Sequence, residues 1–347
     1  MSMPQINNQQ WPVNDLEHVP DCPYCSSEKR KLAYVDVEDW SFKCAPGTWN
    51  YWDCKNCNSL YLDPRPTVST IGRAYAKYYT HGGAESLFTL QAAKSRLKNE
   101  CLTRKLKTPI KPRLHLPTFF GPLLDWIGKW VNVPFGWTLL ATGKKGRLMD
   151  VGCGDGRAVA LAKQLGWDAM GIEIDPEAVR HARQADLNVL EGTDELLSQY
   201  EQQFDCIICS HVLEHVHDPC ALLAKIKAAL KPGGMLLITL PNATSALRHY
   251  FGEDWRGLEA PRHIAIPSDA QLMKLLTQAN FSVQSYADNQ LATAAESYRI
   301  RRRGMFLNFR DLTKARRLDL VPLATPFGND FIKFVCFAPS STKVGEE

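Results

Sequence analysis

The sequence predicts an α/β protein with a Rossmann-like core, preceded by a small cysteine-rich domain that resembles a zinc ribbon. Three observations predict this: two C-x-x-C pairs near the amino terminus, alternating strands and helices from Gly146 onward, and a glycine-rich turn after the first of those strands. With 347 residues, the chain is long enough for several domains. We expect domains at residues 1–66, 67–145 and 146–340, the last with an insertion at about 290–327.

The overall composition is that of an ordinary globular protein, with 45% hydrophobic and 22% charged residues. The net charge of +4 gives no general attraction for nucleic acid, so a nucleic-acid partner is not expected. The opening MSMPQINNQQ lacks the apolar core of a secretory signal, and no apolar stretch has the length needed to cross a bilayer. We therefore expect a cytoplasmic protein.

Two cysteine pairs near the amino terminus have the spacing of metal-binding knuckles. Cys22 and Cys25 form one C-x-x-C pair, and Cys54 and Cys57 form another after 28 intervening residues. In a reducing compartment such pairs favour metal binding over disulfides, and structural zinc is held by four thiolates in a tetrahedron. We predict a structural zinc ion, with strands at 32–35 and 48–52 between the pairs. A redox pair or free thiols are the alternatives.

The bridge between the cysteines and the core has a basic part followed by an aromatic part. Residues 94–113 hold eight basic residues and a single acid, Glu100, and residues 116–140 hold three tryptophans and three phenylalanines. One interpretation is a solvated helix followed by a lid packed on the core. Another is peripheral membrane contact through residues 94–140, because interfacial anchors combine basic and aromatic residues in this way. A nucleic-acid contact is the third.

A glycine turn opens the core at Asp150-Val-Gly-Cys-Gly-Asp-Gly156. An apolar strand at 147–151 precedes the turn and a helical pattern at 157–165 follows it. In such units the ligand binds at the carboxyl end of the strand, and glycines let it approach the backbone. The next strand, 169–174, carries Glu173 at a distance of 23 residues from Asp150. A carboxylate at that point can accept hydrogen bonds from both hydroxyls of a ribose.

This acid-flanked G-x-G-x-G resembles the first motif of class I S-adenosylmethionine-dependent methyltransferases. Gly171-Ile-Glu173 resembles their second strand, and residues 204–209 and 230–238 resemble their fourth strand and the turn and strand that follow. The resemblance covers about residues 146–290, and it implies a seven-stranded fold, methyl transfer and S-adenosylmethionine (SAM) as cofactor. The cofactor-binding residues that it implies are Asp150, Gly152, Gly154, Gly156, Glu173, Asp194, Ser210 and His211.

The segment Ser-His-Val-Leu-Glu-His-Val, residues 210–216, follows the fourth strand. If it is helical, His211, Glu214 and His215 share one face. A weak nucleophile such as a hydroxyl requires a base, and a neutral imidazole with a pKa near 6.5 can accept its proton. We predict that Glu214 and His215 are catalytic. Some O-methyltransferases bind a divalent cation through E-x-x-E-H at this place, but His211 replaces the first acid, which disfavours a hard cation. A site for a borderline metal and a purely structural role stay open.

The acceptor side is expected between residues 241 and 268. Pro241-Asn-Ala-Thr-Ser245, Phe251-Gly-Glu-Asp-Trp255 and Ala260-Pro-Arg-His-Ile264 resemble motifs of a bacterial methyltransferase subgroup associated with surface-polysaccharide and sugar modification. That subgroup commonly carries the cysteine-rich domain and a tyrosine-rich helix after it. The resemblance implies that Arg262 and His263 face the acceptor and that His263 is catalytic. Alternatively, His263 caps Ser268 or packs beneath Trp255.

The sequence thus predicts a methyltransferase that acts on a hydroxyl of a sugar, glycan or lipid-linked saccharide precursor. Sugar C-methyltransferases share the zinc domain but continue into a large carboxyl-terminal domain, so O-methylation is favoured over carbon methylation. An RNA methyltransferase that grips phosphates and a non-catalytic cofactor-binding protein are the alternatives. The basic residues at 299–317 suit phosphate or carboxylate groups, or form a solvated helix in the insertion. The oligomeric state is not predicted.

Overall fold

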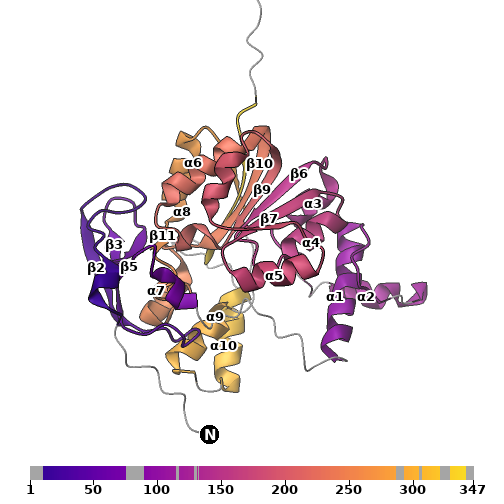
Figure 1. Cartoon of the computed structure of the whole chain (residues 1–347). Helices are drawn as coiled ribbons and strands as arrows, with labels where there is room; N and C mark the ends of the chain where they lie inside the picture. Colours follow the sequence, from indigo (N-terminus) through magenta and orange to yellow (C-terminus); the bar gives the residue numbers. More distant parts are fainter. Residues whose placement is uncertain are drawn as a thin grey trace, which may run out of the picture. The chain divides into compact units, whose positions relative to one another are not determined.

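The computed structural model describes residues 11–75, 90–114, 117–128, 131, 133–286, 293–304, 307–320 and 329–340. Contacts divide the chain into two compact units, each built from several segments. Residues 1–78, 210–227 and 238–336 form what we call the ribbon unit, and residues 79–209, 228–237 and 337–347 form the core unit. Figure 1 labels their helices and strands. The domain limits expected from the sequence stay a prediction.

A seven-stranded sheet has the order β12-β13-β10-β9-β6-β7-β8. β6 runs parallel to both β7 and β9, so the chain winds first to one side of β6 and then to the other. Reciprocal backbone bonds, Gly233 N–H to Pro339 O and Ala338 N–H to Gly234 O, show that β10 and β13 run antiparallel. This mixed sheet confirms the predicted class I methyltransferase fold. Its strands are β6 (Arg147–Val151), β7 (Asp168–Glu173), β8 (Val189–Glu191), β9 (Phe204–Ser210), β10 (Leu230–Pro241), β12 (Ser282–Ser285) and β13 (Phe331–Phe337).

Helices of the core unit follow from local sequence signals. α4 begins after left-handed Gly156 and buries Val159 and Ala162, which lie three residues apart on one face. α5 begins with Pro176, and the side chain of Asp175 accepts a hydrogen bond from the Glu177 N–H. The helical elements of this unit are α1 (Leu90–Leu106), η3 (Thr118–Phe120), α2 (Gly121–Gly128), α3 (Trp137–Thr142), α4 (Arg157–Gln164), α5 (Pro176–Gln184) and η4 (Asp194–Gln199).

The ribbon unit contains a four-stranded sheet in the order β11-β4-β3-β2. β2 (Arg30–Val37) and β3 (Trp49–Cys54) confirm the two strands predicted between the cysteine pairs. β4 (Leu60–Leu62) pairs antiparallel with β3 and also with β11 (Ala265–Ile266). No local pattern predicts the pairing of β4 with β11, because the two strands are about two hundred residues apart. A separate pair joins β1 (Leu16–Glu17) to β5 (Arg65–Pro66).

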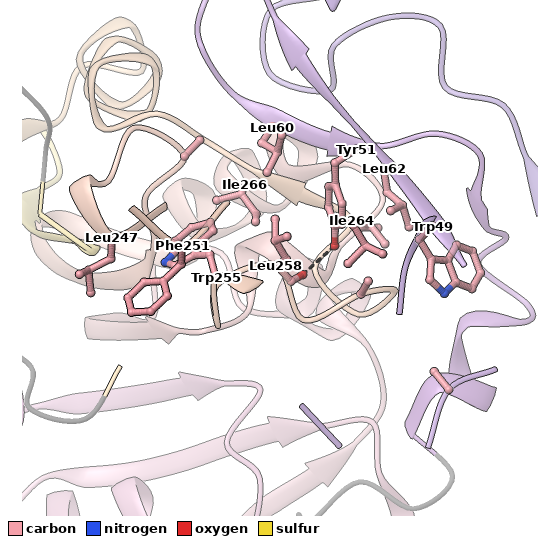
Figure 2. Packing of buried hydrophobic residues seen from close by; sticks show 14 of the residues in the cluster. Trp49, Tyr51, Leu60, Leu62, Leu247, Phe251, Trp255, Leu258, Ile264 and Ile266 are labelled. Atoms are coloured by element: carbon pink, nitrogen blue, oxygen red, sulfur yellow. Dashed lines mark hydrogen bonds between the residues drawn. The ribbon is translucent and has the colours of Figure 1, made fainter. Parts of the chain in front are cut away.

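One hydrophobic core joins the cysteine-rich segment to residues 247–266 within this unit (Figure 2). Tyr51 is fully buried, and its hydroxyl donates toward the carbonyl oxygens of Leu258 and His263 at 2.6 and 2.9 Å. Buried side chains of residues 49–62 and of residues 247–266 pack together, so the two segments share a single core. Its labelled members in Figure 2 are Trp49, Tyr51, Leu60, Leu62, Leu247, Phe251, Trp255, Leu258, Ile264 and Ile266.

Short and long helices complete the description. They are η1 (Val13–Asp15), η2 (Ile71–Tyr75), η5 (Leu213–His215), α6 (Pro219–Ala229), α7 (Ala246–Phe251), η6 (Gly252–Asp254), α8 (Asp269–Gln278), α9 (Thr293–Arg301) and α10 (Phe309–Leu320). Among the helices so described, none has both the length and the apolar character needed to span a membrane. The tyrosine-rich stretch is seen only as far as Tyr75, since Tyr78 and Tyr79 lie outside the described residues.

Arginines of the insertion form ion pairs within the ribbon unit. Arg301 and Arg303 both contact Asp254, at 3.1 and 2.8 Å, and Arg302 contacts Asp311 at 2.5 Å. These three guanidinium groups already form ion pairs with carboxylates, which weakens the interpretation that they bind a phosphate group.

Candidate functional site

The four cysteines predicted to bind zinc lie together. The Sγ atoms of Cys22, Cys25, Cys54 and Cys57 all lie within 4.8 Å of one another. The shortest separations are 3.5 Å between Cys25 and Cys54 and 3.6 Å between Cys22 and Cys57. A zinc–sulfur bond of about 2.3 Å in a tetrahedron places sulfurs about 3.8 Å apart. The spacing therefore fits a closed, structural zinc site.

Both cysteine pairs have the same backbone turn. The residue after each pair, Ser26 or Asn58, is left-handed with φ of 53° or 58°. Its N–H donates to the carbonyl oxygen of the first cysteine of the pair, at 2.9 and 3.0 Å. The thiol of Cys22 hydrogen-bonds to Cys57 and lowers its pKa to about 5, so a thiolate is available there at neutral pH. Two matching turns with sulfurs pointing at each other are what a metal knuckle requires.

Replacing Cys54 with serine should reduce bound zinc from about one ion per chain to a small fraction of that, because a hydroxyl is a poor substitute for the fourth thiolate. Zinc would be measured by elemental mass spectrometry of the purified chain. Cys44→Ser is the matched control, since Cys44 contacts Asp39 and the carbonyl of Ala74 instead. Zinc-free wild-type protein, or full zinc in the Cys54 variant, would contradict the assignment.

The glycine turn after β6 fits a cradle for a ligand. Gly152, Gly154 and Gly156 have φ of 67°, 55° and 78°, a region that favours glycine. A Cβ at Gly154 would meet no other atom within 4 Å, so the space beside this backbone is open. A Cβ at Gly156 would instead lie 2.7 Å from the side chain of Leu187. Gly154 thus leaves room for a ligand, whereas Gly156 lets the helix pack.

Glu173 at the end of β7 is already part of this turn. Its Oε2 accepts the N–H of Gly154 at 2.7 Å, and its Oε1 accepts the N–H groups of Ile174 and Asp175, both at 2.9 Å. A carboxylate offers about four acceptor positions, so about one remains for a ribose hydroxyl. The side chain therefore both shapes the turn and can contact a ligand bound there.

Asp150 is a second buried carboxylate in the same strand pair. It lies opposite Gly171 in the register of β6 and β7 and is 4% exposed. Burial, and then the charge of Glu173, raises the pKa of Asp150 to about 7. A positively charged ligand group would favour the ionised form of this acid. The core unit therefore provides acidic groups suited to a cationic nucleoside.

The remaining predicted cofactor residues lie at the ends of other elements. Asp194 begins η4, where the side chain of Thr193 caps the turn. Ser210 ends β9, and His211 follows with φ of 57° and donates its N–H to the Thr239 oxygen at 2.7 Å. A left-handed histidine is strained, and such strain concentrates at functional positions. Contact between these residues and a cofactor stays a prediction.

Glu214, His215 and His263 form a compact cluster in the ribbon unit. One ligand atom from each lies within 4.8 Å of the others, and the two imidazole centroids are 4.6 Å apart. The helical face expected for residues 210–216 is reduced to the single turn η5, because His211 is left-handed. His211 still reaches Glu214, with Nδ1 at 3.3 Å from Oε1. His263, singled out only through a motif, takes the place expected for His211.

Backbone carbonyls fix the tautomers of both clustered histidines. His215 Nδ1 lies 3.0 Å from the carbonyl oxygen of Arg262, and His263 Nδ1 lies 2.7 Å from that of Gly257. A carbonyl only accepts, so we assign the proton to Nδ1 in each ring and a lone pair to each Nε2. The Oε2 of Glu214 is buried and has no hydrogen-bond partner among the described residues. The cluster thus presents basic atoms ready to take a proton or a cation.

Burial and charge set the ionisation of the cluster. Burial alone would raise the pKa of Glu214, but the hydrogen bond from His211 and the neighbouring imidazoles lower it below its usual value. Burial lowers the pKa of His263 to about 4, although Glu259 opposes this. Glu214 is therefore ionised and His263 neutral near pH 7. The hydroxyl of Tyr75, 3.0 Å from His215 Nδ1, completes the surroundings of His215 and was not identified from sequence.

Arg262 does not face an acceptor, and this expectation is wrong. Its side chain is fully buried and its guanidinium contacts Asp39 at 2.6 Å and Glu259 at 3.2 Å. It also donates to the carbonyl oxygen of Ala74 at 3.0 Å. Arg262 lies in the interior of the ribbon unit because its charge neutralises the buried carboxylates of Asp39 and Glu259. His263 does not cap Ser268 either, because Ser268 caps α8 and donates to the carbonyl oxygen of Cys57.

The strand order and the glycine turn are those of the class I methyltransferase fold. In agreement, residues 133–286 match the family model described as "Methyltransferase domain". This match includes the glycine turn, Glu173, Asp194 and the Glu214–His215–His263 cluster, but leaves out the zinc ribbon and α1.

Some curated relatives are named as O-methyltransferases. Proteins named "Ubiquinone biosynthesis O-methyltransferase" from Xanthomonas campestris pv. campestris and Xanthomonas axonopodis pv. citri are 35% identical over 108 residues, which covers 29% of this chain. The chain spans 45% of the length of these relatives. Among solved structures, a SAM dependent methyltransferase from Archaeoglobus fulgidus has a TM-score of 0.41 at 18% identity, over 58% of this chain and 89% of that chain.

Proposed function

We propose that the protein is a SAM-dependent methyltransferase that methylates a hydroxyl of a sugar, glycan or lipid-linked saccharide precursor. The observation that carries the proposal is a methyltransferase domain whose fourth strand leads directly into the buried Glu214–His215–His263 cluster. β9 pairs with β6 up to Cys209 and Val151, where the glycine turn begins. Glu214 follows Cys209 by five residues, so their Cα atoms are within about 18 Å of each other.

Residues of the core unit would hold the cofactor. The open backbone at Gly154 and the carboxylates of Asp150 and Glu173 are the groups that fit a cationic nucleoside. Asp194 of the core unit, together with Ser210 and His211 of the ribbon unit, is assigned to the same cofactor by resemblance. When bound, SAM supplies a methyl group on a positively charged sulfur that is already activated for displacement, so the protein's own task is to orient the acceptor and remove its proton.

Glu173→Gln should weaken binding of the demethylated cofactor, S-adenosylhomocysteine, about tenfold, because it removes a charged hydrogen-bond acceptor while keeping the side-chain size. Titration calorimetry would measure the affinity. Glu177→Gln is the control, because Glu177 lies four residues on, is exposed, and pairs with Arg180 on α5. Unchanged affinity in the Glu173 variant would remove this residue from the cofactor site.

His215 is the proposed base for the acceptor hydroxyl. Its Nδ1 proton points at the Arg262 carbonyl, which leaves Nε2 to accept the hydroxyl proton as the methyl group is transferred. Glu214 is ionised and buried beside it, and would stabilise the imidazolium that forms. His263 is neutral and offers Nε2 as an acceptor for a hydroxyl of the substrate. These three groups provide what O-methylation requires.

Two features support a sugar as the acceptor: the motifs between residues 241 and 264, and the cysteine-rich domain that occurs together with them. The subgroup that the motifs at 241–245, 251–255 and 260–264 resemble combines them with a cysteine-rich domain, and here both share one core. The relatives' name supports O-methylation as the reaction type. The test is production of S-adenosylhomocysteine with nucleotide-sugar and lipid-linked saccharide fractions, with the methylated sugar identified by mass spectrometry. Methylation of none of these fractions, together with normal cofactor binding, would exclude the sugar class.

A divalent cation is the alternative use of the same cluster. Two Nε2 lone pairs and a free carboxylate oxygen suit a borderline metal. Metal analysis separates the two uses, since a cation here would survive Cys54→Ser and disappear in Glu214→Gln. An RNA acceptor would instead give RNA binding that weakens steeply with salt.

A further inference from the structure

The segment η3–α2 of the core unit carries an apolar stripe that the structure leaves open. Phe119, Leu123 and Trp126 are 72%, 50% and 59% exposed. Leu123 and Trp126 are three residues apart, which places them on one side of α2, and Phe119 lies in the turn η3 directly before this helix. The other side is packed on α1: Leu124 is buried and its carbonyl oxygen lies 3.8 Å from the Sγ of Cys101. α2 therefore has one face committed to the protein and one face without a partner among the described residues.

Cations of α1 and of the loop after it precede this stripe in the sequence, and α1 packs against α2. The two acids of residues 94–126 are both paired: Glu100 with Arg113 at 3.5 Å, and Asp125 with Arg104 through two bonds of 2.7 Å. Six exposed cations make no ion pair with any other described residue. They are Lys94, Arg96, Lys98, Lys105, Lys107 and Lys111.

We infer that this face docks on a membrane surface that contains anionic phospholipids. An amphipathic helix lies in the interface with its apolar residues among the acyl chains, and nearby lysines and arginines bind the anionic headgroups. Charge selects this occupant. A second copy would bring one positive face against another, and nucleic acid would leave the apolar stripe in water. A membrane satisfies both the stripe and the charge.

Binding of the full chain to vesicles tests the inference. Sedimentation would compare phosphatidylcholine vesicles with vesicles that contain about 30% phosphatidylglycerol. We expect clear binding to the second kind only, weakened by salt. Leu123→Ser/Trp126→Ser should lower the partition coefficient about tenfold or more. Lys98→Ala/Lys107→Ala should lower it about 25-fold, or about fivefold per lysine.

Matched controls keep the test specific. Phe309→Ser/Leu312→Ser removes similarly exposed apolar residues from α10, and Lys31→Ala/Lys274→Ala removes exposed lysines elsewhere. Both controls should bind as the wild type does. All variants must retain zinc and S-adenosylhomocysteine binding, which shows that they are folded. The inference would be overturned if the wild type does not bind the vesicles, or if the α2 variant binds them as well as the wild type does. It would also be overturned if the α2 substitutions abolish self-association of the protein but do not change vesicle binding. The assay contains no acceptor, so its result is independent of the proposed reaction.

Discussion

His215→Ala should reduce methyl transfer about 10²–10⁴-fold and leave cofactor affinity unchanged. The imidazole is the group whose Nε2 is free to take the acceptor proton, since its Nδ1 is held by the Arg262 carbonyl. Glu214→Gln should give a comparable loss, because an amide cannot balance the imidazolium. Turnover would be followed as S-adenosylhomocysteine release, and affinity by calorimetry.

A second histidine in the same loop gives the control. His217 lies two residues further on and its Nε2 contacts the carbonyl oxygen of Pro66 at 2.9 Å, so His217→Ala should keep near-normal turnover. A base also differs from a structural residue in the kinetic constant that its loss changes. His215→Ala should lower kcat and leave the KM for the acceptor nearly unchanged. Near-normal turnover in both cluster variants would end the assignment.

Local sequence patterns were sufficient to predict the elements whose structure depends on neighbouring residues. The strand at 147–151, the helix after Gly156 and the cysteine turns depend on residues within about ten positions, so spacing and composition revealed them. Each of these elements would form from the same residues in many folds.

Long-range packing accounts for what the sequence did not reveal. β11 extends the ribbon sheet, and Tyr75 reaches His215 across 140 positions; neither contact has a local signature. Arg262 was placed at the acceptor because it stands beside His263 in a motif. In the structure Arg262 pairs with Glu259 and with Asp39. Asp39 is 223 positions away, and no rule of local spacing predicts that pairing. His263 does lie beside His215 and Glu214, and its catalytic role stays a prediction.

Arg262→Met should lower the free energy of unfolding of the ribbon unit by about 3–5 kcal/mol, the usual result of removing one partner from a buried ion pair. Asp39, with a side chain 1% exposed, would lose two bonds of 2.6 and 3.0 Å and keep its backbone N–H donors and the weak thiol donor of Cys44. Glu259 would retain Arg256. Urea unfolding followed by tryptophan fluorescence would report the change, because Trp11, Trp49 and Trp255 lie in this core.

The pH dependence of this loss identifies its cause. Burial tends to raise the pKa of Asp39, but the Arg262 guanidinium outweighs it and holds the pKa below its usual range, so in the wild type this pair contributes stability that is lost as the pH falls. Without Arg262, burial raises the pKa of Asp39, and protonation then stabilises the fold. The difference in the free energy of unfolding between Arg262→Met and the wild type should therefore become smaller as the pH is lowered. Adding Asp39→Asn to Arg262→Met should recover part of the lost free energy at pH 7.

Arg301→Met is the control, because it removes a partly exposed partner of Asp254. It should lower the free energy of unfolding by less than about 1 kcal/mol. An equal loss in both arginine variants, or a gap that does not change with pH, would show that lost packing rather than an unpaired carboxylate is responsible.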